Sequence, residues 1–279
     1  MRFSLVVPTL NRVDDVRILL QSLVEQTFAD FEVLLVDQND DDRLGPIVEI
    51  FTPRLNLTRL RSTVRNSSHA RNVGLPLCRG ELIAFPDDDC IYPADTLARV
   101  DQAFKDNPNL AMLTGPAMSP EGRLGSGRWE RRSGAITMQT IWTSVIAFNL
   151  FISASWLHRV GKFDETLGVN AKFGSGEETD LVIRIIRAGG VGYYDFSLHV
   201  IHPDKALTEI SLRRAFAYGT GLGYVLRKHN VHPKTTLNFL IRPVGGIVVS
   251  LLKGNVLALS YYWETLRGRV AGLLISTEK

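Results

Sequence analysis

Short apolar runs rich in β-branched residues alternate with stretches of helical periodicity through the first half of the chain. This alternation is typical of βαβ units around a mostly parallel sheet flanked by helices, so it predicts an α/β fold. The expected strands are 3–7, 31–36, 57–60, 82–85 and 110–114, and the expected helices are 14–27, 69–77 and one around 97–104.

The second half of the chain changes character twice. Residues 119–134 carry four glycines and four arginines and predict a flexible excursion. Strand-like and helical patterns then continue to residue 204, which predicts an α/β domain over residues 1–204 and an amphipathic helical C-terminal extension over residues 205–279. The later expected elements are an apolar stretch at 145–152, a helix at 177–187, strands at 191–194 and 199–202, and helical runs at 212–226, 240–252 and 256–274.

Acidic side chains gather where two of these strands end. Asp37 follows the strand at 31–36, and Asp87, Asp88 and Asp89 follow the strand at 82–85 after one proline. In open α/β sheets, ligands bind beyond the carboxyl ends of the strands, so both groups are expected at a binding edge. Asp37 there could accept hydrogen bonds from a nucleobase or ribose, although aspartate also commonly begins a loop.

The three consecutive carboxylates repel one another unless a cation or a hydrogen-bonding ligand lies among them. Oxygen ligands favour a hard ion such as Mg²⁺ or Mn²⁺, which in phosphate chemistry is held by one or two carboxylates. His202, which follows a strand and precedes a proline, is the expected additional metal ligand. A solvated acidic turn is the alternative interpretation of the triplet taken alone.

Two further segments carry candidate chemistry. Arg71, on the first turn of the helix at 69–77, could pair with a diphosphate or with the acidic triplet, and a surface arginine is the alternative. Glu177 and Glu178 follow the loop Gly174-Ser175-Gly176 on the first turn of a helix, where the macrodipole stabilises acidic side chains. A carboxylate presented by a glycine-flanked loop is also suited to act as a general base on an acceptor hydroxyl.

The formal net charge of +3 conceals an asymmetry. Residues 205–279 hold eleven Lys or Arg and three Asp or Glu, a net charge of +8, whereas residues 1–204 carry −5. A basic segment rich in apolar residues suits an anionic membrane surface better than nucleic acid, and a solvated helical appendage is the alternative. Its most apolar window, Val244–Leu252, is far shorter than the roughly 20 residues that span a bilayer, so we expect it to lie on the membrane.

Cys78 and Cys90 are the only cysteines, and they form no CxxC pair or Cys/His cluster. Neither a zinc site nor a disulfide framework is predicted. The chain begins with a strand-like run and shows no long apolar segment or cleavage site after it. We therefore expect a protein of the reducing cytoplasm, held peripherally at the inner face of the cell membrane.

Five segments, taken in order, resemble the family 2 glycosyltransferases, which have the GT-A fold. The resemblance covers about residues 2–205 and implies a metal-dependent enzyme that moves a sugar from a nucleotide-diphosphate-sugar to an acceptor hydroxyl. The segments are Leu5-Val6-Val7-Pro8-Thr9-Leu10-Asn11-Arg12, Val36-Asp37, His69-Ala70-Arg71-Asn72-Val73-Gly74, Asp87-Asp88-Asp89 and Gly176-Glu177-Glu178-Thr179-Asp180-Leu181.

The resemblance implies roles for residues on the nucleotide side of the site. Pro8, Thr9 and Asn11 would line the nucleoside pocket. Asp37 would bond the base, and Arg71 would face the diphosphate or the base of the donor.

It also implies roles for the acidic residues. Asp87 and Asp88 would hold the ribose and the sugar, while Asp89 would coordinate the Mg²⁺ or Mn²⁺ that bridges the two phosphates. The family's base is usually the second residue of a Glu-Asp pair, and this sequence has the longer Glu178 there, with Glu177 as a competitor. The carboxylate would take the acceptor's proton as its oxygen attacks, so the anomeric configuration would invert without a covalent intermediate.

Two other functions share part of this pattern. A sugar-nucleotide nucleotidyltransferase usually carries a Gly-rich, Lys-containing phosphate loop near its N-terminus, whereas this chain has Pro8-Thr9-Leu10-Asn11-Arg12. A non-catalytic donor-binding scaffold would be expected to lose acidic residues that are all present here. The basic, apolar extension further suggests a saccharide or lipid-linked saccharide acceptor in envelope polysaccharide or glycolipid synthesis.

Overall fold

The computed structural model describes residues 1–125, 128–203 and 207–275, and the chain divides into two compact units. The first unit consists of Met1–Arg65, His69–Phe163 and Leu181–Asp204. The second consists of Asn66–Ser68, Asp164–Asp180 and Lys205–Lys279. The sequence predicted one boundary after residue 204, whereas the second unit also takes two segments from the middle of the chain.

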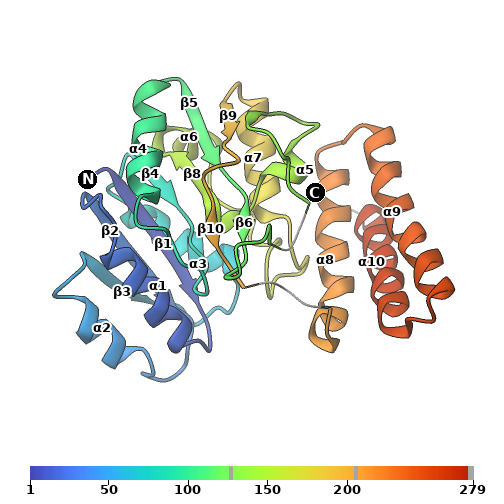
Figure 1. Cartoon of the computed structure of the whole chain (residues 1–279), viewed down its shortest axis with the longest axis horizontal. Coiled ribbons are helices and arrows are strands. Elements are labelled where there is room, and N and C mark those ends of the chain that lie inside the picture. Colours follow the sequence, from blue (N-terminus) through green and yellow to red (C-terminus); the bar gives the residue numbers. More distant parts are fainter. Residues whose placement is uncertain (126–127, 204–206, 276–279) are drawn as a thin grey trace. The chain divides into compact units, whose positions relative to one another are not determined.

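An eight-stranded sheet in the order β3-β2-β1-β4-β8-β5-β9-β7 is the centre of the first unit (Figure 1). β3, β2, β1 and β4 are mutually parallel, and β8 and β7 each run antiparallel to their neighbours. The mostly parallel sheet predicted from the alternating pattern is confirmed. Its strands are β1 Phe3–Thr9, β2 Phe31–Asp37, β3 Leu57–Arg61, β4 Leu82–Ala84, β5 Leu110–Thr114, β7 Gly134–Ile136, β8 Leu150–Ser153 and β9 Val191–Tyr194. A separate two-stranded sheet pairs β6 Ala117–Met118 with β10 Val200–Ile201.

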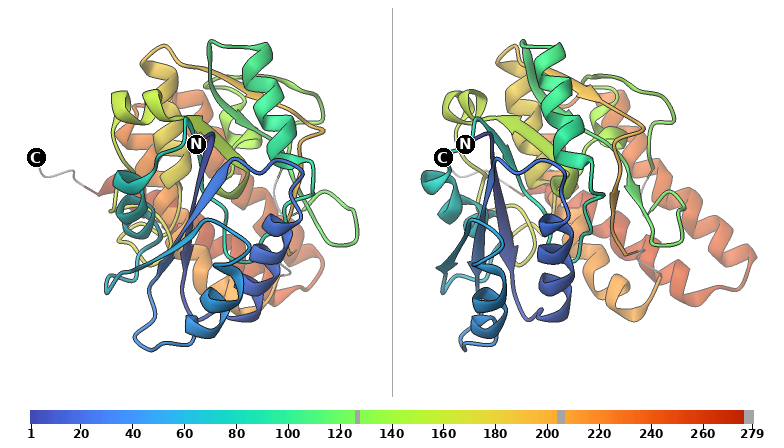
Figure 2. Two further views of the ribbon diagram at one scale, coloured as in Figure 1. Left: turned by 90° about the vertical axis from the view of Figure 1, so that its left-hand side faces the viewer. Right: turned by 60° about the vertical axis from the view of Figure 1, so that its left-hand side comes forward.

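Helices cover both faces of the large sheet (Figure 2). Leu5 and Val7 of β1 belong to the same buried cluster as Leu20 of α1. Val6 points the opposite way, as the period of two in a strand requires, and meets Gly74 of α3. Both faces of β1 are buried, which explains its unbroken apolar run. The helices are α1 Asp14–Val24, α2 Gly45–Phe51, α3 Ser67–Gly74, α4 Thr96–Asp106, α5 Ile141–Ser144, α6 Ala154–Val160 and α7 Glu177–Arg187, with 3₁₀ turns at Leu75–Leu77 and Ala147–Asn149.

The second unit is built on α8 Glu209–Lys228, α9 Pro233–Leu252 and α10 Val256–Leu274. α8 and α10 run parallel and meet through glycines one turn apart, Gly219 and Gly223 on α8 and Gly268 and Gly272 on α10. A Cβ at Gly223 would overlap the carbonyl oxygen of Arg269, so the two backbones are in direct contact. Such small-residue spacing permits close helix crossings, and the glycine-rich run of α8 is therefore a packing surface.

The segment Asp164–Asp180 packs on α8. The backbone N–H of Gly174 donates to the carbonyl oxygen of Ala217 at 3.0 Å, and the ring of Phe173 stacks on Tyr224 with centroids 4.1 Å apart. These contacts explain why a segment from the middle of the chain belongs to the C-terminal unit.

A buried ion cluster secures the end of the same segment. The carboxylate of Asp180 is fully buried and accepts from Lys228 Nζ at 2.7 Å and lies 2.8 Å from His229 Nε2. Lys228 also donates to Asp164 at 2.7 Å. Burial acts to raise the pKa of Asp164, but hydrogen bonds from Lys228 and Thr166 outweigh it and hold the pKa below its ordinary value. The contribution of Asp164 to stability is consequently present above its unfolded pKa and is lost as the pH falls through the folded value.

Within the described residues, α9 is the helix with the length and composition that crossing a membrane requires. It runs for 20 residues, more than twice the apolar window that the sequence suggested, because polar residues at its start extend the same helix. Length and composition alone are weak evidence of a membrane span.

The glycine crossing predicts a sharp effect on stability. Replacing Gly223 by alanine should lower the free energy of unfolding by about 2 kcal/mol or more, because a methyl group must force the two helix backbones apart. Urea denaturation followed by far-ultraviolet circular dichroism measures the change.

Gly245→Ala is the matched control, since a Cβ at that position in α9 meets no atom within 4 Å. It should stabilise the helix by about 0.5–1 kcal/mol through helix propensity. Equal effects of the two substitutions would contradict close packing between α8 and α10.

Candidate functional site

Three neighbouring strands bring polar residues to one edge of the sheet. β1 pairs with β2 so that Thr9 lies opposite Asp37, and it pairs on its other side with β4. β4 ends at Ala84 and leads through Pro86 into Asp87. The residues predicted at the carboxyl ends of the strands therefore share one edge.

Asp37 is fully buried, and both of its carboxylate oxygens already accept hydrogen bonds. Oδ1 accepts from the backbone and side-chain nitrogens of Asn39 at 2.9 and 2.7 Å. Oδ2 accepts from Arg59 at 2.6 and 2.9 Å and from Arg61 at 2.8 Å. Charge-assisted bonds of this kind offset the burial of a carboxylate. Asp37 thus anchors the end of β2, and Arg61, 46% exposed, is its most accessible partner.

The loop after β1 is joined to the same network. Asn11 adopts a left-handed backbone with φ of 59°, and its N–H donates to Asn39 Oδ1 at 2.8 Å. Arg43 donates to Asn11 Oδ1 at 3.1 Å. Pro8 and Thr9 are buried in the last two positions of β1. The nucleoside-side residues expected from the sequence are therefore neighbours of Asp37 in the fold.

Arg71 lies on α3 and is almost completely buried. Its guanidinium pairs with Asp87 at 3.0 Å and lies over the ring of Phe163, 5.5 Å from the centroid. A buried arginine held in this way adds positive charge at the strand edge without needing solvent. The surface-arginine alternative is wrong for this position.

Arg12 supplies a second cation to the acidic triplet. Its guanidinium lies 3.4 Å from Asp88 and 2.9 Å from Asp89, and it also bonds Asp15 of α1 at 2.8 Å. Burial raises the pKa of Asp88 to about 7, although Arg12 acts in the opposite direction. The triplet is a partly desolvated acidic group held together by arginines, and the solvated-turn alternative does not describe it.

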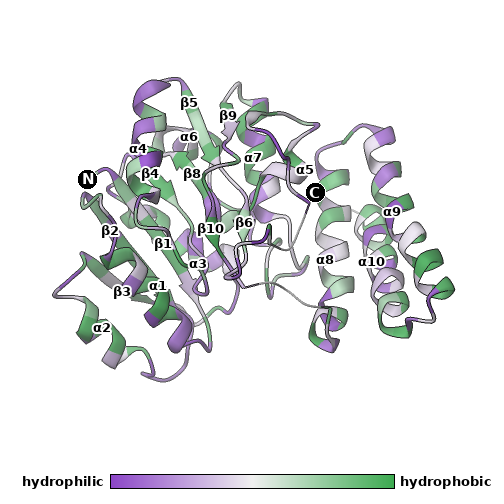
Figure 3. Ribbon diagram, viewed as in Figure 1, coloured by the Kyte–Doolittle hydropathy of each residue, from purple (hydrophilic) through white to green (hydrophobic). Residues whose placement is uncertain are grey.

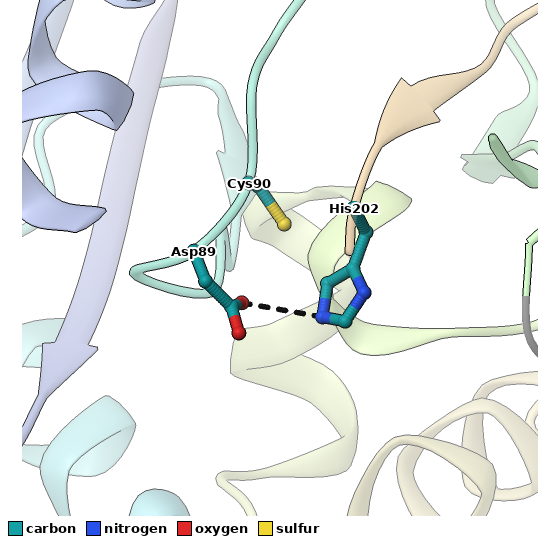
Figure 4. Close-up of side chains that lie close together, drawn as sticks. All are labelled: Asp89, Cys90 and His202. Carbon is teal, nitrogen blue, oxygen red and sulfur yellow. Dashed lines mark ion pairs between the residues drawn. The ribbon is translucent and has the colours of Figure 1, made fainter. Parts of the chain in front are cut away.

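Asp89, Cys90 and His202 form a compact group of potential ligands (Figure 4). One ligand atom from each lies within 4.8 Å of the others, and Asp89 Oδ1 is 3.2 Å from His202 Nε2. His202 follows β10, so two segments more than a hundred residues apart in sequence meet here. Asp89 and His202, the two predicted metal ligands, are brought together.

The hydrogen bonds of His202 define its tautomer. Nδ1 lies 2.8 Å from the carbonyl oxygen of Pro203, and because a carbonyl can only accept, Nδ1 carries a proton. In the neutral ring, the Nε2 lone pair then faces the carboxylate of Asp89. The ring is held in place by stacking on Phe148, with centroids 4.6 Å apart. Two facing acceptors are stabilised by a cation between them or by a second proton on the ring.

The donor set fits Mn²⁺ better than Mg²⁺. A carboxylate and an imidazole suit Mn²⁺, whereas Mg²⁺ prefers an all-oxygen shell. Cys90 is fully buried, and burial raises its thiol pKa well above the ordinary value, so it remains a protonated, poor ligand for a hard cation. Of the three residues, Asp89 and His202 are the ones suited to hold a divalent ion.

Glu177 and Glu178 begin α7 and belong to the second unit. The preceding Gly176 has a positive φ of 91°, a conformation that favours glycine and lets the chain turn into the helix. Glu177 is buried, whereas Glu178 is partly exposed. Of the two, Glu178 is the more exposed to solvent.

Comparison with known proteins defines the family. The model of glycosyl transferase family 2 matches residues 4–158, more than half of the chain. This chain is a family 2 glycosyltransferase. A PGL/p-HBAD biosynthesis glycosyltransferase of Mycobacterium bovis is 41% identical over 101 residues, which are 35% of this chain and 40% of that protein. The chain thus matches less than half the length of this curated relative.

Solved structures of glycosyltransferases share the fold of the enzyme. The mannosyltransferase PcManGT of Pyrobaculum calidifontis, solved with GDP-Man and Mn²⁺, superposes with a TM-score of 0.69 at 18% identity, over 98% of this chain and 87% of that one. TarS of Staphylococcus aureus, residues 1–349 with UDP-GlcNAc, gives 0.62 at 16% identity, over 97% and 92%. The predicted GT-A fold is confirmed.

Three arginines of this site received no role from the sequence. Arg59 and Arg61 are separated by one residue on β3, and Arg61 is paired in register with Asp37. The sequence did contain a signal for them, because Arg59 and Arg61 occupy alternate positions of a strand next to the strand that ends at Asp37. Arg12 stood inside the first matching segment, but its pairing with Asp88 and Asp89 depends on the fold.

The Asp37 network predicts a difference between two arginines. Arg59→Met should lower the free energy of unfolding by about 2 kcal/mol, because it leaves a buried carboxylate with fewer donors. Arg43→Met should change it by less than about 0.5 kcal/mol, since Arg43 pairs mainly with exposed Asp41. Urea denaturation of both variants measures the difference, and similar losses would contradict the anchoring role of Asp37.

Proposed function

We propose that this glycosyltransferase moves a sugar from a nucleotide-diphosphate-sugar to a hydroxyl of a saccharide or lipid-linked saccharide in envelope polysaccharide or glycolipid synthesis. The observation that carries the proposal is the meeting of Asp89 and His202 beside arginine-paired carboxylates at the carboxyl edge of the sheet. The names of relatives lend support, since they include a mycobacterial PGL/p-HBAD enzyme and a staphylococcal poly(ribitol-phosphate) β-N-acetylglucosaminyltransferase. The proposed place of action is the cytoplasmic face of the cell membrane.

We assign the donor to the edge formed by β2, β1 and β4. Pro8, Thr9 and Asn11 line the nucleoside pocket. Asp37 accepts a hydrogen bond from the nucleobase after Arg61 gives up its own hydrogen bond to Asp37. Arg71 balances charge on the diphosphate. Asp87 and Asp88 bind the ribose and sugar hydroxyls. Hydrogen bonds from these hydroxyls replace part of the water that the carboxylates lose on burial.

Asp89 and His202 are proposed to hold Mn²⁺ or Mg²⁺, with Mn²⁺ favoured by the imidazole ligand. When bound, the ion supplies positive charge to the departing nucleoside diphosphate. The carbonyl oxygen of Pro203 accepts a hydrogen bond from Nδ1–H of His202, which would leave the Nε2 lone pair available to the ion.

Glu178 is the proposed general base. It takes the proton of the acceptor hydroxyl as the acceptor oxygen attacks the anomeric carbon from the face opposite the diphosphate, so the configuration inverts. Its partial exposure supports this choice over buried Glu177. No side chain is required to form a covalent bond to the sugar.

The first experiment measures release of nucleoside diphosphate from UDP-, dTDP- and GDP-sugars with Mn²⁺ or Mg²⁺. We expect slow, metal-dependent hydrolysis of one donor by the wild type and a loss of about a hundredfold or more in Asp89→Ala and Glu178→Gln. Asp95→Ala and Glu209→Gln, which change exposed carboxylates, serve as controls and should retain the rate. Release of pyrophosphate when the protein is given a nucleoside triphosphate and a sugar phosphate would instead identify a nucleotidyltransferase.

Arg12 provides a test of the metal site that does not depend on turnover. Because its guanidinium pairs with Asp88 and Asp89, it should compete with a divalent cation for the same carboxylates. Arg12→Gln should bind Mn²⁺ about fivefold more tightly in the absence of donor. This change corresponds to about 1 kcal/mol, the free energy of a partly exposed ion pair that water screens. Isothermal titration calorimetry measures the affinity.

Arg17→Gln removes the same charge from an exposed position of α1 and should leave Mn²⁺ affinity within about twofold of wild type. Unchanged or weaker Mn²⁺ binding by Arg12→Gln would count against a metal site at Asp89.

A further inference from the structure

α9 carries an apolar face that the second unit leaves exposed. Every residue of this face is large and aliphatic. Spacings of four, three, four and three residues from Leu237 to Leu251, with Leu252 four residues after Val248, keep them on one side of the helix. We call this set the α9 apolar face: Leu237, Ile241, Val244, Val248, Leu251 and Leu252. Exposure ranges from 43% at Val244 to 84% at Leu252. Figure 3 shows the hydrophobic colour along α9.

The opposite side of α9 is committed to packing. Phe239 and Pro243 are buried there, and Gly246 lies against the ring of Tyr262 on α10. Arg269 of α10 also donates to the carbonyl oxygen of Phe239. α9 is therefore anchored to α10 by one side, and its apolar face is directed away from that contact.

The charged residues of α9 and of the loop that follows it have one sign. The sequence from Pro233 to Trp263 contains Lys234, Arg242 and Lys253 and no acidic residue. All three cations are exposed. Arg242 and Lys253 are eleven residues apart, which is about three helical turns, so they follow the same flank of the α9 apolar face. Trp263, 53% exposed on α10, adds an aromatic side chain of the kind found at membrane interfaces.

We propose that the α9 apolar face docks into the surface of an anionic lipid bilayer. Six exposed aliphatic side chains provide the apolar area, and the flanking cations complement lipid phosphates and other anionic headgroups. A second copy of the chain fits less well, because pairing two such faces would bring like charges together. The proposal does not require sugar transfer, although it would bring the enzyme to a lipid-linked acceptor.

The geometry favours a helix in the plane of the membrane. Crossing the hydrocarbon would immerse Arg242 in mid-helix and would carry the packed side of α9 with it, including Arg269 of α10. Lying in the interface buries the apolar face to a shallow depth, leaves Arg242 exposed to headgroups and water, and keeps Arg269 in its contact with Phe239. Peripheral attachment therefore satisfies all the polar groups that a span would desolvate.

The test measures co-sedimentation of the full chain with vesicles of pure phosphatidylcholine and of phosphatidylcholine with 30% phosphatidylglycerol. We expect binding to the anionic vesicles and at least tenfold weaker partition for Ile241→Ser/Val248→Ser. Ile18→Ser/Ile50→Ser, which changes equally exposed isoleucines of α1 and α2, is the matched control and should bind as wild type.

Charge is tested separately. Arg242→Gln/Lys253→Gln should lower partition into anionic vesicles several-fold and weaken its dependence on salt, whereas Arg17→Gln/Arg54→Gln should not. Circular dichroism and donor hydrolysis of each variant show that the fold and the catalytic site are intact, so loss of vesicle binding is distinguishable from loss of function.

Three outcomes would overturn the proposal. Equal vesicle binding by wild type and Ile241→Ser/Val248→Ser would remove the α9 apolar face from the contact. A wild-type dimer in analytical ultracentrifugation that dissociates in this variant, with no vesicle binding, would identify a second copy as the occupant. Retention of bound wild type after alkaline carbonate extraction would indicate a span, since a peripheral helix is released.

Discussion

Repulsion among carboxylates at one edge of the sheet is the constraint on which the site depends. Parallel pairing of β2, β1 and β4 brings Asp37 and the Asp87–Asp89 triplet together whether or not their charges are balanced. Arginines from three separate segments pair with them: Arg12 after β1, Arg59 and Arg61 on β3, and Arg71 on α3. These pairs compensate the carboxylates without a ligand, and a cation that bound the triplet would compete with Arg12.

The two kinds of carboxylate in this edge have different tasks. Asp37 has all its acceptor capacity engaged by neighbouring backbone and side chains, which is typical of a structural anchor. Asp88 and Asp89 lie 3.4 and 2.9 Å from the partly exposed guanidinium of Arg12, and burial raises the pKa of Asp88 to about 7. The negative charge of Asp88 and Asp89 is less fully compensated than that of Asp37. This difference favours binding of a polar or cationic ligand at Asp88 and Asp89.

Local sequence was sufficient for most of the fold and for half of the site. β5, α7 and β9 begin and end where the apolar pattern predicted, because each is bounded by glycine, proline or polar residues. α2 was missed, since seven residues give too few turns for a periodic signal. The partners of each acidic residue could not be predicted, because Arg59 and His202 reach them only through strand register and the path of the chain. The assignment of residues 164–180 to the second unit likewise depends on distant contacts with α8.

That interleaving fixes an order of events during synthesis. The ribosome releases the loop and first turn of α7, with Glu178, well before α8 exists. Gly174 and Asp180 find their partners only after Ala217, Lys228 and His229 have emerged. The nascent chain can form most of its large sheet early, whereas the segment from Gly174 to Asp180 gains its partners only once α8 is complete. A chain that ended between α7 and α8 would therefore keep the edge formed by β2, β1 and β4 but would lack the partners of Gly174 and Asp180.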